Sequence, residues 1–371
     1  MSEGIATNKM PSFLQDGHFK WGLSIDDAWY YAGLPSPKSI IIPYLLSVKL
    51  PRGPFRFAVP STLYKCSCGQ QNDEDNQLRE ERCQQLASDL KQAGIQFVRI
   101  WFQWNLFQPK LNGEESTILQ FPLDDLVREL NEAGIEIIAV IGNGYERFLP
   151  EGLEANDSSR YLVHLRESSR QIVEHYKGKI SAWQVENEPN WWLEHYATHW
   201  RSGGIWLEPG IQDLVLNELS TAVREADPNS TVIINLEADH EKTNWEHFSK
   251  LCDILGLDYY PNYSHSSPVD ASRIGDAAKI RKATGHPVFI AETGYPSGPL
   301  IMGYDKEKQK DYVKQACEVA RSTEGVEGLC LWRFSDTYWH SFPDQENHFG
   351  LVEKNGTQKP AWQEYLRQVK L

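Results

Sequence analysis

From about residue 75 to the end of the chain, segments with apolar residues at helical spacing alternate with short runs rich in β-branched residues. This alternation is typical of βα units that build a parallel sheet. Residues 90–95 and 130–135 share the sequence Leu-x-x-Ala-Gly-Ile, in which the glycine can take the left-handed conformation that ends a helix directly before a strand. The pattern therefore predicts two successive βα modules in the same phase.

The short apolar runs predict eight strands, over residues 20–25, 96–101, 136–141, 180–187, 231–236, 253–259, 287–292 and 328–333. Eight parallel strands with helices between them close into a (β/α)₈ TIM barrel, which is an α/β fold. An open doubly wound sheet is the alternative. It is disfavoured because no Gly-x-Gly-x-x-Gly or Walker-type turn follows any predicted strand.

The domain organisation follows from the length of the chain. A (β/α)₈ barrel of about this length routinely forms one domain, so we expect a single domain over residues 1–371. Residues 30–74, between the first strand and the first helix, form an unusually long connection rich in Pro and Gly. They predict a loop excursion over one end of the barrel.

Composition narrows the range of partners. The formal net charge of -14 opposes the phosphate backbone of nucleic acid, and no basic stripe interleaved with aromatic residues appears. The longest apolar run, residues 39–48, is too short to span a bilayer, and residues 1–17 lack the apolar core of a signal peptide. We therefore expect a cytoplasmic protein, unless a signal peptide has been removed. The sequence leaves the oligomeric state open.

Six scattered cysteines indicate reduced thiols in the core rather than a disulfide framework. Four of them fall where a helix or strand is expected to be buried: Cys83, Cys252, Cys317 and Cys330. Only Cys66 and Cys68 are close together, and a Cys-x-Cys without a second Cys/His pair is a weak zinc signal. We expect no metal and no organic cofactor.

Two glutamates stand at the ends of predicted strands, where the chemistry of a barrel is located. Glu188 follows the fourth predicted strand in the sequence Asn-Glu-Pro, and Glu292 ends the seventh. Strict alternation along a strand would place Glu292 on the same face as Val288 and Ile290, and Glu186 on the same face as Glu188. A single glutamate at a strand end could simply form an ion pair at the barrel rim. Two of them, on strands nearly across the barrel from each other, favour acid/base chemistry over that interpretation.

These residues resemble the clan A retaining β-glycoside hydrolases with (β/α)₈ barrels, which include cellulases, β-galactosidases and β-glucosidases. The resemblance runs from about Phe19 to the C-terminus. It implies that Glu188, in Asn187-Glu188-Pro189, is the general acid/base and that Glu292 is the nucleophile. The implied reaction is retaining hydrolysis of a β-linked glycoside by double displacement, with a carbohydrate as the partner of the site.

The resemblance also implies supporting roles. It places Arg99 beside the nucleophile, gives Tyr260 a hydrogen bond to it, assigns Asn187 to the sugar 2-hydroxyl and makes Trp332 the floor of the subsite for the cleaved sugar. Tyr260 is preferred over Tyr259 because alternation puts it on one face with Gly256 and Asp258. The segment 347–352, followed by Lys359-Pro360-Ala361-Trp362, is also similar to the end of such enzymes, with a structural role.

Three positions leave their roles open. Related families often have Asn where this chain has Asp258, and they often have a histidine at the end of the third strand, where this chain reads Ile141-Gly142-Asn143-Gly144-Tyr145. Glu186 is expected to have a structural or substrate-binding role.

The substrate is the least determined part of the prediction. Trp191 and Trp192 follow the acid/base in an aromatic loop and are expected to line a leaving-group subsite. A β-glucoside, a β-galactoside or a β-glucan oligosaccharide would fit, with exo and endo action both open. The alternatives are a barrel that binds carbohydrate without hydrolysis, which needs no acid/base pair, and a metal-dependent barrel hydrolase, which needs a His/Asp cluster at strand ends.

Overall fold

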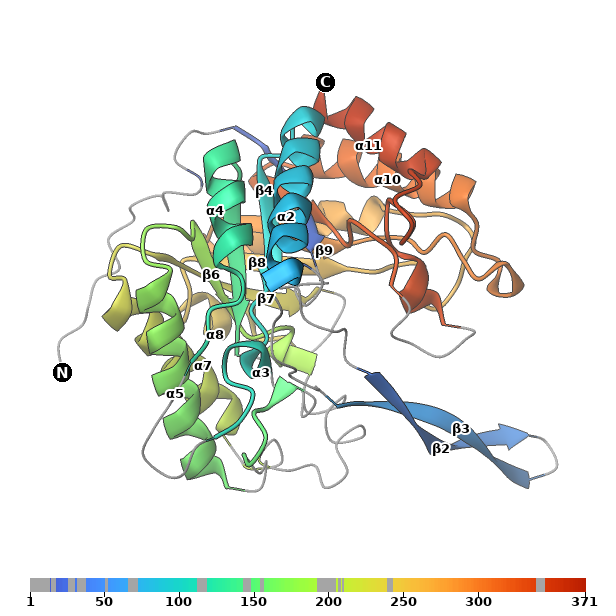
Figure 1. Cartoon of the computed structure of the whole chain (residues 1–371). Helices are drawn as coiled ribbons and strands as arrows, with labels where there is room; N and C mark the ends of the chain where they lie inside the picture. Colours follow the sequence, from blue (N-terminus) through green and yellow to red (C-terminus); the bar gives the residue numbers. More distant parts are fainter. Residues whose placement is uncertain are drawn as a thin grey trace.

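The eight predicted strands are all present and form one closed parallel barrel in a computed structural model of the chain (Figure 1). The structure describes residues 14, 18–25, 31, 38–50, 53–65, 73–111, 119–142, 148–153, 157–191, 205, 208, 210–238, 243–337 and 344–371. The barrel strands are β1 (Lys20–Ile25), β4 (Phe97–Trp101), β5 (Glu136–Ile141), β6 (Ala182–Val185), β7 (Thr231–Glu237), β8 (Ile254–Tyr259), β9 (Val288–Thr293) and β10 (Val326–Leu331). Each strand pairs with its neighbours in chain order, and β10 closes on β1. The prediction of a (β/α)₈ TIM barrel is confirmed.

Helices separate the strands and cover the outside of the barrel (Figure 1). They are α2 (Asp73–Ala93), α3 (Trp104–Phe107), α4 (Asp124–Ala133), α5 (Ser158–His175), α7 (Ile211–Ala226), α8 (Trp245–Ser249), α9 (Ala277–Thr284), α10 (Lys306–Ser322) and α11 (Pro360–Val369). Short 3₁₀ turns lie at η3 (Pro189–Trp191), η5 (Ser272–Asp276), η6 (Leu300–Met302) and η7 (Gln345–His348). In the described part of the chain, no helix is both long and apolar enough to cross a bilayer.

The segment between β1 and α2 contains an antiparallel hairpin. Its strands β2 (Lys38–Leu50) and β3 (Gly53–Lys65) form a sheet of their own, drawn in blue in Figure 1. The excursion over one end of the barrel and the single-domain organisation stay predictions.

Two apolar layers hold the barrel together. Between strands and helices lies the larger cluster, which includes Val288 and Ile290 of β9. Inside the barrel lies a smaller cluster: Leu14, Phe97, Ile138, Ala182, Ile233, Ile254, Phe289, Ala291 and Cys330. Side chains alternate along a strand, so the second residue after each of these cluster members also faces the barrel interior. In β4, β6, β7 and β8, these second residues lie nearer the carboxyl ends of the strands.

The four cysteines predicted to be core thiols are buried and free: Cys83, Cys252, Cys317 and Cys330. Burial raises the pKa of the Cys83 and Cys252 thiols to about 12. These thiols are therefore inert packing groups. Cys66 and Cys68 lie outside the described residues.

Candidate active site

Polar side chains gather inside the barrel at the carboxyl ends of its strands, where the apolar interior cluster stops. They are Arg99 of β4, Gln184 of β6, Asn235 of β7, Asp258 of β8 and Glu292 of β9. All five are at most 5% exposed. Buried polar groups need partners, and these groups find them mainly in one another.

Glu292 is held by a cation and a hydroxyl. Its Oε1 lies 2.7 Å from Nη1 of Arg99, and its Oε2 accepts a hydrogen bond of 2.8 Å from the hydroxyl of Tyr260. Burial and the neighbouring carboxylate of Glu292 raise the pKa of Tyr260 well above its usual value, so this hydroxyl keeps its proton and remains a donor. Both partners favour the ionised form of Glu292.

The orientation of Glu292 corrects one sequence prediction. Val288 and Ile290 face the helices, whereas Phe289 and Ala291 face the interior, so strict alternation would send Glu292 outwards. The register between β8 and β9 shifts by one residue after Leu257, which brings Asp258 opposite Glu292. An irregularity of this kind re-aims a side chain, and here it turns Glu292 towards the barrel interior.

Arg99 is the centre of the cationic side of the site. Its guanidinium is fully buried and donates to Gln184 Oε1 at 2.6 Å and to Asn187 Oδ1 at 2.9 Å, in addition to its ion pair with Glu292. An arginine with three directed contacts has a fixed position. It therefore fixes the carboxylate of Glu292 relative to Asn187, the residue before Glu188.

Glu188 has a less compensated environment. Its carboxyl group accepts a hydrogen bond of 3.3 Å from Asn187 Nδ2, and its backbone N–H donates to Asn235 Oδ1 at 3.2 Å. Burial, followed by the carboxylates of Glu292 and Glu237, raises the pKa of Glu188 to about 8. This carboxyl group is protonated at neutral pH.

The placement of Glu186 differs from the prediction. β6 ends at Val185, and both Glu186 and Glu188 have positive φ values, 61° and 47°, so alternation no longer applies beyond the strand. The carboxyl group of Glu186 lies against Gly142, close enough that a Cβ added to Gly142 would come within 2.6 Å of its Oε1 and 2.8 Å of Leu219. Glu186 therefore points into the layer between barrel and helices, where it is fully buried, and it does not share a face with Glu188.

Asn235 and Gln184 connect the two glutamates, and the sequence patterns above did not indicate either of them. Asn235 Nδ2 donates to Asn187 Oδ1 at 2.8 Å and to Asp258 Oδ2 at 2.6 Å, while its Oδ1 accepts from Gln184 Nε2 at 2.7 Å. The signal that could have found them is a polar residue inside an otherwise apolar strand, on the face that points inwards. Such residues need buried partners and therefore mark a polar network.

Asp258 brings a third carboxyl group to the site. It is fully buried opposite Glu292 in the sheet, and burial followed by the carboxylates of Glu292 and Glu188 raises its pKa well above the usual range. Glu292 and Asp258 are buried and Glu188 is half-buried, so ionising all three carboxyl groups beside one guanidinium is costly. Asp258 therefore ionises less readily than an exposed aspartate, and its Oδ2 accepts a hydrogen bond from Asn235 next to the glutamates.

Aromatic rings form one wall beside Glu292. The ring of Trp332, directly after β10, lies 5.8 Å from that of Tyr260 and 4.7 Å from that of Phe349, measured between centroids. Trp332 is half-buried. The side chain of Trp191, and Trp192 and Asn143 entirely, lie outside the described residues.

The described residues contain no group of three or more His, Cys, Asp or Glu side chains arranged to hold a metal ion. Within that part of the chain, Arg99 is the cation that pairs with Glu292.

A closed (β/α)₈ barrel with two glutamates at the carboxyl ends of its fourth and seventh strands defines a class of protein, the retaining glycoside hydrolases of clan A. A comparison with protein families is more specific: the model of glycosyl hydrolase family 10 matches residues 148–368. The chain belongs to this family. The match includes Glu188 and Glu292 but not Arg99.

Individual relatives agree with this class. A β-1,4-xylanase from Dictyoglomus thermophilum is 24% identical over 245 residues, which are 59% of this chain and 67% of that protein. Among solved structures, GH5_18 from Streptomyces cattleya in complex with GlcNAc has a TM-score of 0.66 at 17% identity and covers 78% of this chain and 74% of its own. A family 39 glycoside hydrolase from Bacteroides cellulosilyticus has a TM-score of 0.57 at 15% identity, over 85% of this chain and 68% of its own. At these identities the two structures show the barrel fold alone.

Proposed function

We propose that this protein hydrolyses β-linked oligosaccharides by double displacement, with Glu292 as the nucleophile and Glu188 as the general acid/base. The observation that carries the proposal is the difference between the two carboxyl groups. Glu292 is paired with Arg99 at 2.7 Å and with the Tyr260 hydroxyl at 2.8 Å, whereas burial raises the pKa of Glu188 to about 8. Two neighbouring carboxyl groups whose environments separate their pKa values can act as nucleophile and acid.

The reaction follows from these protonation states. Glu188 donates its proton to the departing glycosidic oxygen while the carboxylate of Glu292 attacks the anomeric carbon and forms a glycosyl ester. Glu188, now ionised, takes a proton from water, and this water releases the sugar from Glu292. Glu188 is protonated again at the end, so each cycle consumes one glycosidic bond and one water molecule and regenerates both glutamates.

Asn187 and Trp332 are the residues we assign to the sugar. Asn187 Oδ1 is occupied by Arg99 and Asn235, so its Nδ2, which also faces Glu188, is the group left to donate to the 2-hydroxyl. A hydrogen bond at that hydroxyl strengthens in the transition state. The half-buried ring of Trp332 offers an apolar face for the sugar that is cleaved.

The substrate class is a β-linked glycan. The named activity of the Dictyoglomus thermophilum relative makes β-1,4-linked xylan the first polymer to test, next to β-glucans and small β-glucosides and β-galactosides. Trp191 and Trp192 remain the proposed contacts beyond the cleaved bond.

The test is a panel of nitrophenyl β-xyloside, β-glucoside and β-galactoside together with xylan and β-glucan, measured as released nitrophenol or new reducing ends. We expect Glu292→Gln to lower turnover of every active substrate by at least about 1,000-fold. Glu246→Gln makes the same chemical change at an exposed ion pair on α8 and is expected to leave turnover unchanged. Wild-type turnover of none of these substrates, or turnover that survives Glu292→Gln, would contradict the proposal.

A further inference from the structure

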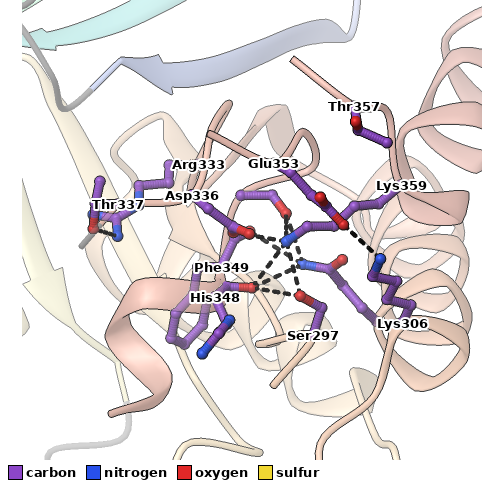
Figure 2. A network of polar contacts seen from close by, with 12 residues as sticks. Ser297, Lys306, Arg333, Asp336, Thr337, His348, Phe349, Glu353, Thr357 and Lys359 are labelled. Carbon is purple, nitrogen blue, oxygen red and sulfur yellow. Dashed lines mark hydrogen bonds and ion pairs between the residues drawn. The ribbon is translucent and has the colours of Figure 1, made fainter. Parts of the chain in front are cut away.

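Lys359, the residue before α11, carries a buried ammonium group in a network of polar contacts that includes Ser297 and Asp336 (Figure 2). Its side chain is 1% exposed. Nζ donates to Ser297 Oγ at 2.8 Å, to Asp336 Oδ1 at 2.7 Å and to the carbonyl of Gly350 at 2.7 Å. Nζ also lies 3.4 Å from the carbonyl of His348, so the ammonium group has four acceptors, one in the connection after β9 and three in the connection between β10 and α11.

These contacts hold the backbone of residues 348–350. The amide of Gln309 on α10, itself fully buried, lies 3.4, 3.2 and 3.1 Å from the carbonyls of His348, Phe349 and Gly350. Ser297 donates its N–H and its hydroxyl to the carbonyl of His348, at 2.9 and 3.1 Å. The peptide units on both sides of Phe349 are therefore fixed by buried donors.

The ring of Phe349 points from this fixed segment to the site. It is 1% exposed, and its centroid lies 4.7 Å from that of Trp332 and 5.8 Å from that of Tyr260. It also lies against Gly294, two residues after Glu292, where an added Cβ would come within 2.9 Å of the ring. The ring of Phe349 thus packs against the ring of Tyr260, whose hydroxyl donates to Glu292.

A purely stabilising role does not require this arrangement. Burial lowers the pKa of Lys359 and raises that of Asp336, which means that both charges are costly where they are. Replacing a buried ion pair by well-packed apolar groups is often neutral or stabilising. What the ammonium supplies, and an apolar side chain cannot, is a set of directed bonds to carbonyl groups of residues 348–350.

We propose that Lys359 is a positioning residue for the nucleophile: through the backbone of residues 348–350 it holds the Phe349 ring, and this ring holds Tyr260 and Trp332 in place around Glu292. The proposal rests on the proposed function of Glu292. It extends that function to a residue that touches neither substrate nor a reacting atom.

The test is a double-mutant cycle between Lys359→Met and Tyr260→Phe, measured on a small aryl glycoside. A misplacement of about 1 Å in an active site can lower the rate by about 100-fold, so we expect Lys359→Met to lower kcat by roughly 10- to 100-fold. If Lys359 acts through Tyr260, the double variant has a kcat within about 3-fold of the slower single variant. Effects that multiply, or a kcat of Lys359→Met within about 3-fold of wild type, would overturn the proposal.

Lys20→Met is the matched control. Lys20 is also buried and forms an ion pair of 2.5 Å with Glu136. This pair lies at the amino ends of β1 and β5, which is the end of the barrel opposite the site. We expect it to lower stability without lowering kcat by more than about 3-fold, because positioning depends on the location of the lysine rather than on the loss of a buried charge.

Phe349→Leu keeps the contacts of Lys359 but removes the aromatic ring that packs against Tyr260 and Trp332. It serves as the second variant if Lys359→Met does not fold. It is expected to lower kcat and to be non-additive with Tyr260→Phe in the same way, and a wild-type kcat would overturn the proposal. A crystal structure of either variant separates this proposal from the proposed function, because it needs no activity. Displacement of the Tyr260 hydroxyl from Glu292 supports the positioning role, and an unmoved Tyr260 contradicts it.

Discussion

At the level of single residues, the two glutamates differ in their neighbours more than in their chemistry. Arg99 and Tyr260 both contact the carboxylate of Glu292. Asn235 donates hydrogen bonds to Asn187, the residue before Glu188, and to Asp258. Electrostatic preorganisation of this kind makes the largest contribution to the rate enhancement of many enzymes. The buried guanidinium of Arg99 thus stabilises the carboxylate that must stay ionised.

Glu188→Ala removes the proton donor and leaves Glu292 with its partners. We expect turnover of substrates with poor leaving groups to fall by roughly 100- to 10,000-fold, since that is the usual contribution of general acid/base catalysis, and activated aryl glycosides to be affected far less in bond cleavage. Azide should restore turnover of the aryl glycosides and yield a β-glycosyl azide, because it needs no general base to attack the glycosyl ester. Chromatography with proton NMR of the product checks this. An α-glycosyl azide, or no azide product, would contradict the roles of the two residues.

The sequence was sufficient to indicate most residues of this group. Arg99, Asn187, Tyr260 and Glu292 came from strand-end positions and a family resemblance, and the structure brings them together. Asn235 and Gln184 could not be ranked in the same way, since single polar residues in strands are also found in ordinary cores. Their importance lies in contacts across strands, which the order of residues along the chain does not contain.

At the level of elements, periodicity predicted the strands well and the directions of their last residues poorly. The apolar runs matched all eight barrel strands because burial on both faces produces such runs in a parallel barrel. Alternation failed at the ends of β6 and β9, where positive φ values and a register shift turn Glu186 away and Glu292 inwards. Functional sites are the places where such local irregularities concentrate.

The placement of Glu186 can be tested through Gly142, which follows β5 with a φ of 93°. Gly142→Ala adds a Cβ against the Glu186 carboxyl group and Leu219, at 2.6 and 2.8 Å. Gly134→Ala is the matched control, because Gly134 has a φ of 78° but no neighbouring atom within 4 Å of an added Cβ. We expect about 1 to 2 kcal/mol of destabilisation for Gly134→Ala from its backbone conformation and roughly 1 to 3 kcal/mol more for Gly142→Ala from overpacking. Urea unfolding measures both, and equal losses would contradict the placement of Glu186 in the helix layer.

At the level of the whole molecule, the buried carboxyl groups cost stability. Glu188 has a pKa of about 8 in the folded chain and an ordinary value of 4.5, so between these pH values the folded state binds a proton that the unfolded chain has lost. The stability associated with this group is complete below about pH 4.5 and is lost as the pH rises towards 8.

Glu188→Gln removes this titration and should make the protein more stable than wild type. We expect the gain in the free energy of unfolding to be larger at pH 8 than at pH 5 by at least about 1 kcal/mol, because the folded wild type keeps a proton on Glu188 that the unfolded chain loses ever more favourably as the pH rises. Urea unfolding at both pH values provides the measurement, with Glu246→Gln on the surface as the control. A gain that does not grow with pH would show that Glu188 is not held protonated by the fold.

The contacts of Lys359 show what the sequence could not predict at this scale. Ser297 lies in the connection after β9, whereas Asp336 and Gly350 lie in the connection between β10 and α11, and nothing in their spacing indicates that they meet on one ammonium group. Such contacts depend on how the loops pack over the barrel end. Periodic patterns describe helices and strands and contain no information on loop packing.

The proposed mechanism depends on Glu292 as the nucleophile, and the anomer that the wild-type enzyme releases first tests this most directly. Double displacement inverts the anomeric carbon twice, so a β-linked substrate should give the β-anomer first, with the α-anomer growing in later by mutarotation. Proton NMR within the first minutes of reaction on an oligosaccharide from the active panel distinguishes the two. The β-anomer is the expected result. An initial α-anomer would show that water attacks the sugar directly, and it would contradict the assignment of Glu292 even if both glutamates proved essential.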